Sequence, residues 1–369
     1  MLDSLDALYA FFTALVIATL AVPLCERLAR RLGAIDIPGP RSLHTAPTPH
    51  ISGLAILAAV LVAGLVWLPA DTETRTILAG ALAIAAIGLL DDLVDLPPGI
   101  KLAGQFGAAL IPVLGGVRID VVTIPFLGGF EFGWLGYPLT MLGIVAVVNV
   151  INFIDGVDGL AAGVCAIAAA AFAIIAVSLD RYAAGALAAL TAGAALGYLR
   201  HGFPPASSFM GDTGSNLLGY LLATAAVQGA LKTNAVVALA LPLVVLAVPI
   251  LDMTFVVAKR IKYRQPVYQA DRWHFHHRMA NKGFSQRKTL AYLYGWTAAL
   301  AGLALAMRFV PYSDNRGNFD AVWTVVMLGF GAFALAASIY LVVVLEILEF
   351  RRVRRRNPDT GEFERIQPP

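Results

Sequence analysis

Long hydrophobic runs separated by short polar segments make up most of this chain. Most of the runs approach the roughly 20 residues that a helix needs to cross the core of a bilayer. There are eleven of them, at residues 5–24, 51–68, 76–90, 100–114, 134–151, 160–179, 182–199, 216–231, 235–258, 289–310 and 321–350. The pattern predicts an all-α, polytopic membrane protein with about 11 transmembrane helices. The third and fourth runs are short, so they are expected to extend into their flanks or to be shielded by other helices.

One connection between the runs has a different pattern. Residues 117–133 alternate apolar and polar positions around Gly128-Gly129, which predicts a small β-hairpin. Composition supports the membrane interpretation, because 59% of the residues are hydrophobic, only 14% are charged and the mean hydropathy is +0.75. The formal charge of +3 is too small to suggest a nucleic-acid partner.

The basic residues are distributed unevenly between the two sides that eleven spans would create. Of the 27 Lys and Arg residues, 21 fall on the side that holds the C-terminus. The positive-inside rule therefore predicts a cytoplasmic C-terminus and an outside N-terminus. The first ten residues contain no Lys or Arg, so the first run is expected to be a helix rather than a secretory signal. We expect one catalytic membrane domain over residues 1–350, followed by a basic and then polar cytoplasmic tail at 351–369.

Three acidic clusters lie on the same predicted cytoplasmic side. They are Asp-Asp-Leu-Val-Asp at 91–95, the Asn- and Asp-rich stretch at 149–160, and Gly-Asp-Thr-Gly-Ser at 211–215. Ionisable groups at membrane depth are costly and usually serve a function. If the clusters converge, they form a site for a divalent cation, and Mg²⁺ favours one or two carboxylates together with phosphate oxygens.

Each cluster also has a structural alternative. Asp91 and Asp95 share a helix face if the helix continues, but they equally fit a solvated helix end before a proline turn. Asp155 and Asp158 are candidates for chemistry or for capping the next helix. Asp212 opens a helix whose N-terminus suits a phosphate, or is a plain cap. Phe209 stacks on a base or is simply buried.

The longest predicted cytoplasmic segment, at 259–288, contains several histidines and arginines. His274, His276 and His277 lack the partners and spacing of a structural zinc site. With Arg278 they are better interpreted as donors to a phosphate, although the basic flanks also fit a solvated topology signal. Cys25 and Cys165 are expected to be small buried hydrophobic residues.

Together these motifs resemble the polyprenyl-phosphate N-acetylhexosamine-1-phosphate transferases of the glycosyltransferase 4 family. The resemblance covers nearly the whole chain and rests on four motifs in the same order. These are residues 91–95 with Lys101, the stretch at 149–163, Phe-Met-Gly-Asp-Thr-Gly-Ser at 209–215, and His-Phe-His-His-Arg at 274–278.

The resemblance implies transfer of a sugar 1-phosphate from a UDP-sugar to undecaprenyl or another polyprenyl phosphate, with release of UMP, on the cytoplasmic face of the cell membrane. It implies Mg²⁺, with Mn²⁺ as an alternative, and a homodimer is compatible with it. The implied catalytic residues are Asp91, Asp92, Asp155 and Asp158, and the implied metal ligands are Asp212 and Asp92. The candidates for binding nucleotide or substrate are Asn152, Phe209, Lys101, Arg41, His44, His274, His276, His277 and Arg278.

The form of the histidine motif favours UDP-N-acetylglucosamine as the donor over UDP-MurNAc-pentapeptide. Two local departures from the family pattern, His201-Gly202 and His50-Ile51-Ser52-Gly53, leave the sugar open. The division of roles among the four catalytic candidates also stays open.

Two other classes fit part of the pattern. An intramembrane prenyltransferase also uses aspartate clusters with Mg²⁺, but it leaves the histidine segment and Gly-Asp-Thr-Gly-Ser without a role. A cation-coupled transporter buries acids in a bundle, but transporters tend to have repeat-related halves with sites at the midplane. Here the acids lie at helix ends on one side.

Overall fold

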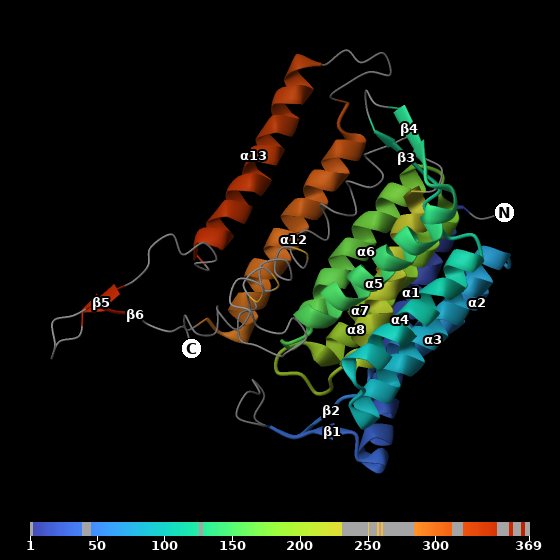
Figure 1. Ribbon diagram of the computed structural model, residues 1–369, viewed down its shortest axis with the longest axis vertical. Coiled ribbons are helices and arrows are strands. Elements are labelled where there is room, and N and C mark those ends of the chain that lie inside the picture. The colour runs from blue at the N-terminus through green and yellow to red at the C-terminus, as the bar shows by residue number, and fades with distance from the viewer. Residues whose placement is uncertain are drawn as a thin grey trace.

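The computed structural model describes residues 3–38, 46–124, 128–230, 250, 257, 260, 284–311, 320–344, 354–356 and 363–365. The described chain is mostly helical (Figure 1). Its α-helices are α1 (Ser4–Leu32), α2 (Gly53–Trp67), α3 (Thr72–Val94), α4 (Pro98–Leu114), α5 (Gly136–Ile154), α6 (Leu160–Ser178), α7 (Tyr182–Gly202), α8 (Gly211–Ala230), α12 (Gln286–Phe309) and α13 (Ala321–Val344). Ten of the predicted runs therefore coincide with helices, and the run at 235–258 lies almost entirely outside the described residues.

Six of the described helical segments are long and apolar enough to cross a membrane. They are Ser4–Leu32, Thr72–Val94, Gly133–Ile154, Leu160–Ser178, Tyr182–Gly202 and Gln286–Phe309. The prediction of a multi-pass helical membrane protein is confirmed at this level. The short run at 76–90 extends at both ends into α3, as expected, whereas α4 has only 17 residues.

Successive helices from α1 to α8 run in alternating directions. The end of α1 contacts the loop after α7 through the Glu26 carboxylate, which accepts a 2.9 Å hydrogen bond from the Ser207 hydroxyl. At the opposite end, the Trp67 indole of α2 donates a 2.9 Å hydrogen bond to Thr13 of α1. The ends of α1, α3, α5 and α7 therefore meet the starts of α2, α4, α6 and α8 at one end of the bundle, which we call the site end.

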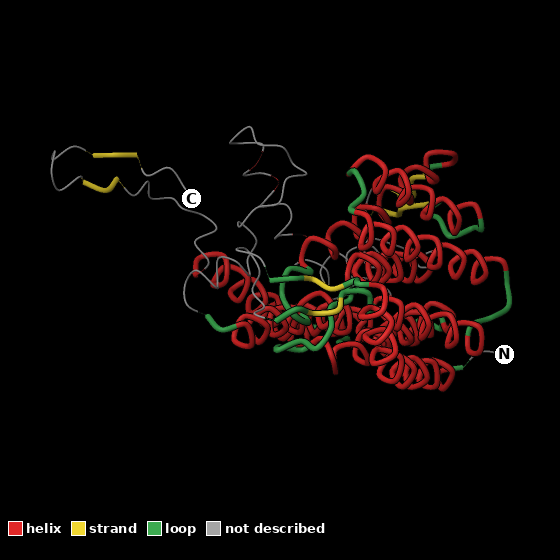
Figure 2. The backbone as a smooth tube through the Cα atoms, turned by 90° about the horizontal axis from the view of Figure 1, so that it is seen from below, coloured by secondary structure: helices red, strands yellow, loops and turns green. Residues whose placement is uncertain are grey.

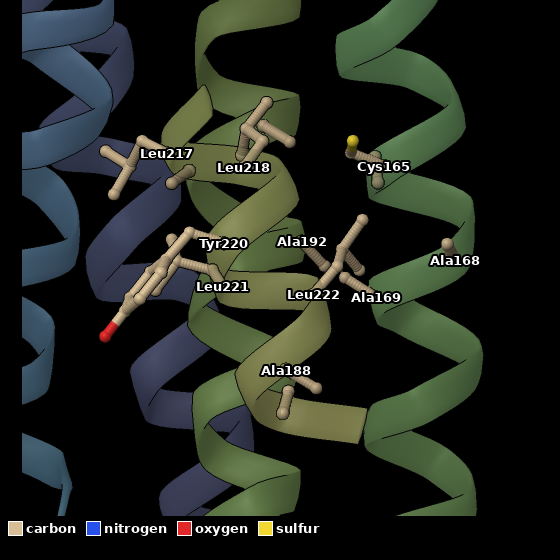
Figure 3. Packing of buried hydrophobic residues seen from close by; sticks show 14 of the residues in the cluster. Cys165, Ala168, Ala169, Ala188, Ala192, Leu217, Leu218, Tyr220, Leu221 and Leu222 are labelled. Carbon is tan, nitrogen blue, oxygen red and sulfur yellow. The ribbon is translucent and has the colours of Figure 1, made fainter. Parts of the chain in front are cut away.

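Small residues allow the helices to pack closely. A Cβ atom on Gly193 of α7 would lie 2.1 Å from the Phe11 carbonyl oxygen of α1, so only glycine fits there. Further inside, Leu222 of α8 lies beside Ala169 of α6, whereas the Tyr220 ring points away from α6 (Figure 3). The Tyr220 hydroxyl donates a 2.9 Å hydrogen bond to the Ile77 carbonyl of α3.

Three short antiparallel hairpins accompany the helices. β1 (Ile35–Asp36) pairs with β2 (Thr48–Pro49) at the site end, in front of the helices in the view of Figure 2. β3 (Val121–Ile124) pairs with β4 (Gly128–Glu131) at the opposite end, which confirms the hairpin predicted over 117–133. β5 (Arg354–Arg356) and β6 (Phe363–Arg365) pair within the predicted tail. The division into a domain at 1–350 and a tail stays a prediction.

Candidate active site

A lysine joins two of the predicted acidic clusters at the site end of the bundle. The Lys101 ammonium at the start of α4 lies 2.9 Å from an Asp91 carboxylate oxygen at the end of α3. It also donates a hydrogen bond to the Asp212 carboxylate in the first turn of α8. The three side chains are only 11–27% exposed. One positive charge thus lies between two carboxylates in a partly desolvated place, where ion pairs are stronger than in water.

Asp92, next to Asp91, has a different set of partners. Its carboxylate accepts hydrogen bonds from the backbone N–H groups of Asp212 at 2.7 Å and Thr213 at 3.0 Å. The Thr213 hydroxyl donates a third, 2.6 Å bond to it. A helix has unpaired N–H groups and a partial positive charge at its start. Asp92 therefore caps α8 from another helix and fixes the backbone that carries Asp212.

The close approach of Asp92 depends on glycine. Gly211, the first residue of α8, has φ of +65°, in the left-handed region that glycine adopts without strain. A Cβ atom at this position would lie 2.4 Å from the His50 carbonyl oxygen and 2.5 Å from an Asp92 carboxylate oxygen. Any side chain here would therefore push Asp92 away from the start of α8.

The Asn- and Asp-rich stretch contributes amides from the end of α5. The Asn152 side-chain amide donates to an Asp212 carboxylate oxygen at 2.8 Å and to the Ser215 hydroxyl at 3.0 Å. One turn deeper, the Asn149 amide donates to the Gln105 side-chain oxygen of α4 at 2.7 Å. Asn152 therefore brings this stretch to Asp212, whereas Asn149 lies in a second layer.

The two carboxylates between α5 and α6 lie beside this group. Within the described ranges, no hydrogen bond or ion pair is formed by the Asp155 carboxylate. Burial raises its pKa well above the usual range, and the negative charges of Asp212, Asp92 and Asp158 raise the pKa further. Asp158 instead accepts a 3.1 Å hydrogen bond from the backbone N–H of Ala206. It therefore holds the loop after α7, while Asp155 is free to act on a ligand.

That loop is fastened to the segment just before α2. The Phe209 N–H donates to the Pro49 carbonyl at 2.8 Å, and the Ser52 N–H donates to the Phe209 carbonyl at 3.1 Å. The Ser52 and Ser208 hydroxyls also hydrogen-bond each other. The Phe209 ring is half-buried. The segment His50-Ile51-Ser52-Gly53, which departs from the family pattern, thus positions the predicted base-stacking residue.

The structure decides several of the structural alternatives. α3 ends at Val94, and Asp95 adopts the left-handed conformation with φ of 55°, so it does not continue the helix face of Asp91. α6 has Gly159 at its N-cap position without any side-chain cap bond, so neither Asp155 nor Asp158 caps it. Asp212 is not its own helix's cap either, because Asp92 serves that purpose.

The predicted site residues thus divide into two groups. Those brought together at the site end are Asp91, Asp92, Lys101, Asn152, Asp155, Asp158, Phe209 and Asp212. Those that lie outside the described residues are Arg41, His44, His274, His276, His277 and Arg278. Thr213 and Ser215 were not predicted as site residues, although both lie in the Gly-Asp-Thr-Gly-Ser motif. Thr213 is a hydrogen-bond partner of Asp92, and Ser215 is one of Asn152.

The side chains at the site end can be compared with the ligands that the predicted Mg²⁺ would need. In the part of the chain that the structure describes, no three His, Cys, Asp or Glu side chains are arranged to hold a metal ion. Mg²⁺ does not need such a cage, because it binds one or two carboxylates and takes its remaining ligands from phosphate and water. Asp212 with Asn152 beside it, and the unpaired Asp155 carboxylate, offer oxygen ligands of this kind.

Comparison with known proteins places these residues in a family. The model described as "Glycosyl transferase family 4" matches residues 74–230, which include most of the site. The chain is 38% identical over 301 residues to a Bacillus subtilis (strain 168) protein named "Probable undecaprenyl-phosphate N-acetylglucosaminyl 1-phosphate transferase", covering 80% of this chain and 84% of that one.

Two further relatives have names that state different transferred groups. A Mycobacterium leprae (strain TN) protein, "Decaprenyl-phosphate N-acetylglucosaminephosphotransferase", is 38% identical over 84% of this chain and 86% of its own length. A Heliobacterium modesticaldum (strain ATCC 51547 / Ice1) protein, "Phospho-N-acetylmuramoyl-pentapeptide-transferase", is 34% identical over 59% of this chain and 73% of its own length.

Proposed function

This chain belongs to glycosyl transferase family 4, and we propose that it transfers N-acetylglucosamine 1-phosphate from UDP-N-acetylglucosamine to a polyprenyl phosphate. The observation that carries the proposal is the meeting of Asp91, Asp92, Lys101, Asn152 and Asp212 at one end of a helical membrane bundle. Family membership argues against a prenyltransferase or a transporter.

The proposed reaction exchanges one phosphoanhydride for another. An oxygen of the lipid phosphate forms a bond to the β-phosphorus of the UDP-sugar. The bond between that phosphorus and the bridging oxygen breaks, and UMP leaves with the bridging oxygen. Because similar bonds form and break, the protein has mainly to position two anionic substrates and to neutralise their charge.

Lys101 is the described side chain best suited to that neutralisation. Its ammonium lies between Asp91 and Asp212, so its position is fixed before any substrate binds. Such preorganised charge costs no reorganisation at the moment of reaction. We assign Lys101 to a diphosphate oxygen and Asp91 to the lipid phosphate. The Leu96 N–H holds the Asp91 carboxylate in place by donating a 2.8 Å hydrogen bond to it.

Mg²⁺ is proposed as the cofactor, with Mn²⁺ as an alternative. Asp212, Asn152 and Asp155 would hold it, and the bound ion would stabilise negative charge on the transferred phosphate. Asp92 is left out of this set, because its three hydrogen bonds to Asp212 N–H, Thr213 N–H and the Thr213 hydroxyl commit its carboxylate to the start of α8. Asp158 is assigned to the loop through Ala206.

We also propose that the site end faces the cytoplasm of a cell-membrane protein with about 11 spans. Support comes from the last turns of α1, which carry Arg27, Arg30 and Arg31 at the site end. α8 ends away from the site, whereas α12 starts at the site end, where Arg287 donates a 3.1 Å bond to the Pro204 carbonyl. The span predicted at 235–258 lies almost entirely outside the described residues and stays a prediction.

The test is UMP release by detergent-purified protein given undecaprenyl phosphate, Mg²⁺ and one of three donors in parallel. The donors are UDP-N-acetylglucosamine, UDP-N-acetylgalactosamine and UDP-MurNAc-pentapeptide. We expect UMP with UDP-N-acetylglucosamine, and only when both lipid and Mg²⁺ are present. Release with the pentapeptide donor alone would move the protein to the activity named for the Heliobacterium relative. No release from any donor by folded protein would reject the proposal.

A further inference from the structure

Two fully enclosed side chains beneath the carboxylates have polar atoms without hydrogen-bond partners among the residues that the structure describes. Asn216 in α8 is 0% exposed, and neither its amide nitrogen nor its oxygen has a partner among the described residues. Gln105 in α4 is 1% exposed, and its amide nitrogen is similarly unpaired there. Buried amides are nearly always hydrogen-bonded, to protein or to ordered water. These atoms therefore point to a ligand that pairs with them.

The two side chains occupy equivalent places on two helices. α4 and α8 both start at the site end, where Lys101 and Asp212 are bonded to each other. Gln105 lies four residues after Lys101, and Asn216 lies four residues after Asp212. Residues four apart share a helix face. Gln105 and Asn216 therefore both lie one helical turn deeper in the bundle.

The orientation of Gln105 is fixed by a neighbour. Both hydrogens of the Asn149 amide nitrogen are used, one by the Val145 carbonyl at 2.8 Å and one by the Gln105 oxygen at 2.7 Å. Gln105 must keep its oxygen toward Asn149, so its nitrogen faces elsewhere as a donor. Rotating the Gln105 amide by 180° would set two nitrogens against each other.

The chemistry of the unpaired atoms selects the ligand. They comprise donors, from Gln105 and Asn216, and one acceptor, the Asn216 oxygen. A cation would meet the donor N–H groups, and an anion would meet the acceptor oxygen. Water accepts from N–H groups and donates to a carbonyl oxygen, so it satisfies both kinds. One turn after Asn216 along α8, Tyr220 is 0% exposed and hydrogen-bonded to Ile77.

We propose that Gln105, Asn149 and Asn216 form a buried hydration site that holds at least one ordered water and positions the layer above it. Asn152 lies one turn from Asn149, and Asp212 lies one turn from Asn216, so the amide layer supports both residues that contact each other at 2.8 Å. This supporting role rests on the proposed function. The water site itself does not.

Two measurements test the water site without any substrate. A high-resolution map of the full chain is expected to contain water density within about 3.2 Å of the Gln105 nitrogen and an Asn216 amide atom. Asn216→Leu removes two polar atoms at similar volume. If water pairs them, the melting temperature falls, by about 2 °C or more. If they are truly unpaired, their removal raises it, and a rise or an empty map overturns the proposal.

A third measurement tests the supporting role. Mn²⁺ binding, followed by electron paramagnetic resonance without UDP-sugar, is expected to weaken about tenfold in Asn216→Leu, the effect of losing support behind a ligand. Asn216→Ser keeps a donor and an acceptor and should restore most of the affinity. Thr224→Val is the matched control, because Thr224 is buried deeper in α8 and, among the described residues, bonds only to the Tyr220 and Leu221 carbonyls.

Each outcome bears on one part of the proposal. Unchanged Mn²⁺ affinity in a less stable Asn216→Leu protein would overturn the supporting role and keep the water site. If Asn216→Leu does not fold, the density map tests the water site and the Mn²⁺ affinity of Asn216→Ser tests the supporting role. A protein that has the water but releases no UMP would reject the proposed function and leave the hydration site in place.

Discussion

The Asp92 carboxylate holds the Asp212 backbone, through a 2.7 Å hydrogen bond from the Asp212 N–H. Neighbouring aspartates of one motif therefore have separate tasks. Asp91 contacts Lys101, whereas Asp92 caps the helix that carries Asp212. The distinction predicts different consequences for changing each residue.

Asp92→Ala should lower both stability and metal binding. Loss of a helix cap typically costs about 0.5–2 kcal/mol of unfolding free energy. Thr213→Val removes only one of the three bonds to Asp92 and should cost less. Because both changes remove the same hydroxyl bond, the double variant should lose less than the sum of the two single losses. Thermal unfolding of the four proteins measures this, and additive losses or an unchanged Asp92→Ala would contradict the cap.

Lys101→Met should separate metal binding from turnover. It leaves the Asp91 and Asp212 carboxylates without their shared positive charge. Divalent-ion affinity in the absence of UDP-sugar should then rise, because the ion no longer competes with an ammonium group. UMP release should fall by about 100-fold or more, on the scale of losing one preorganised charge contact. Mn²⁺ titration and the UMP assay measure the two effects. Weaker Mn²⁺ binding in Lys101→Met would refute this arrangement.

Asp155→Asn should stabilise the metal-free protein at high pH. The pKa of Asp155 is raised in the folded state, so between the ordinary value near 4 and the raised value the folded protein binds more protons than the unfolded chain. Stability of the unsubstituted protein therefore falls as pH rises through that interval. The Asn variant lacks this loss. Melting curves in EDTA at pH 8 should favour the variant, and the advantage should shrink toward pH 4.

The same Asp155→Asn change should remove UMP release, since the carboxylate is assigned to the metal ion. Greater stability combined with lost activity is the pattern of a residue kept for function. A variant that melts below the unsubstituted protein at pH 8 would show that the Asp155 carboxylate has a stabilising partner.

We expect Asp95 to serve only at the end of α3, without a role in catalysis. It is exposed and has φ of 55°, which glycine adopts freely. Asp95→Gly should therefore keep stability and UMP release close to those of the unsubstituted protein. Asp95→Val places a β-branched side chain in the left-handed region, at a cost of about 1–2 kcal/mol. Loss of activity in a stable Asp95→Gly protein would contradict this and add Asp95 to the catalytic candidates.

Much of the helical framework could be predicted from the sequence, because apolar runs of bilayer length have few alternative structures. The hairpin at 117–133 was predicted from its alternating apolar and polar residues. The convergence of Asp91 and Asp212 was expected only as a hypothesis, because the sequence alone gives no spatial distance between residues that are 121 positions apart.

The individual hydrogen bonds could not be predicted. Whether an aspartate caps its own helix, another helix or none depends on how helix ends are placed in space. The bond between Asp92 and Thr213 follows from the packing of α3 against α8. The bond between Asp158 and Ala206 follows from the packing of the end of α5 against the loop before α8. Asp95 could not be assigned either, because the end of α3 at Val94 depends on the left-handed turn that follows.

The most direct test of the central claim follows the β-phosphorus itself. Protein supplied with Mg²⁺, undecaprenyl phosphate and UDP-N-acetylglucosamine labelled with ³²P at the β-phosphate should move the label into the lipid and release unlabelled UMP. Label that stays in water as UDP, with the sugar alone on the lipid, would contradict transfer of a sugar 1-phosphate.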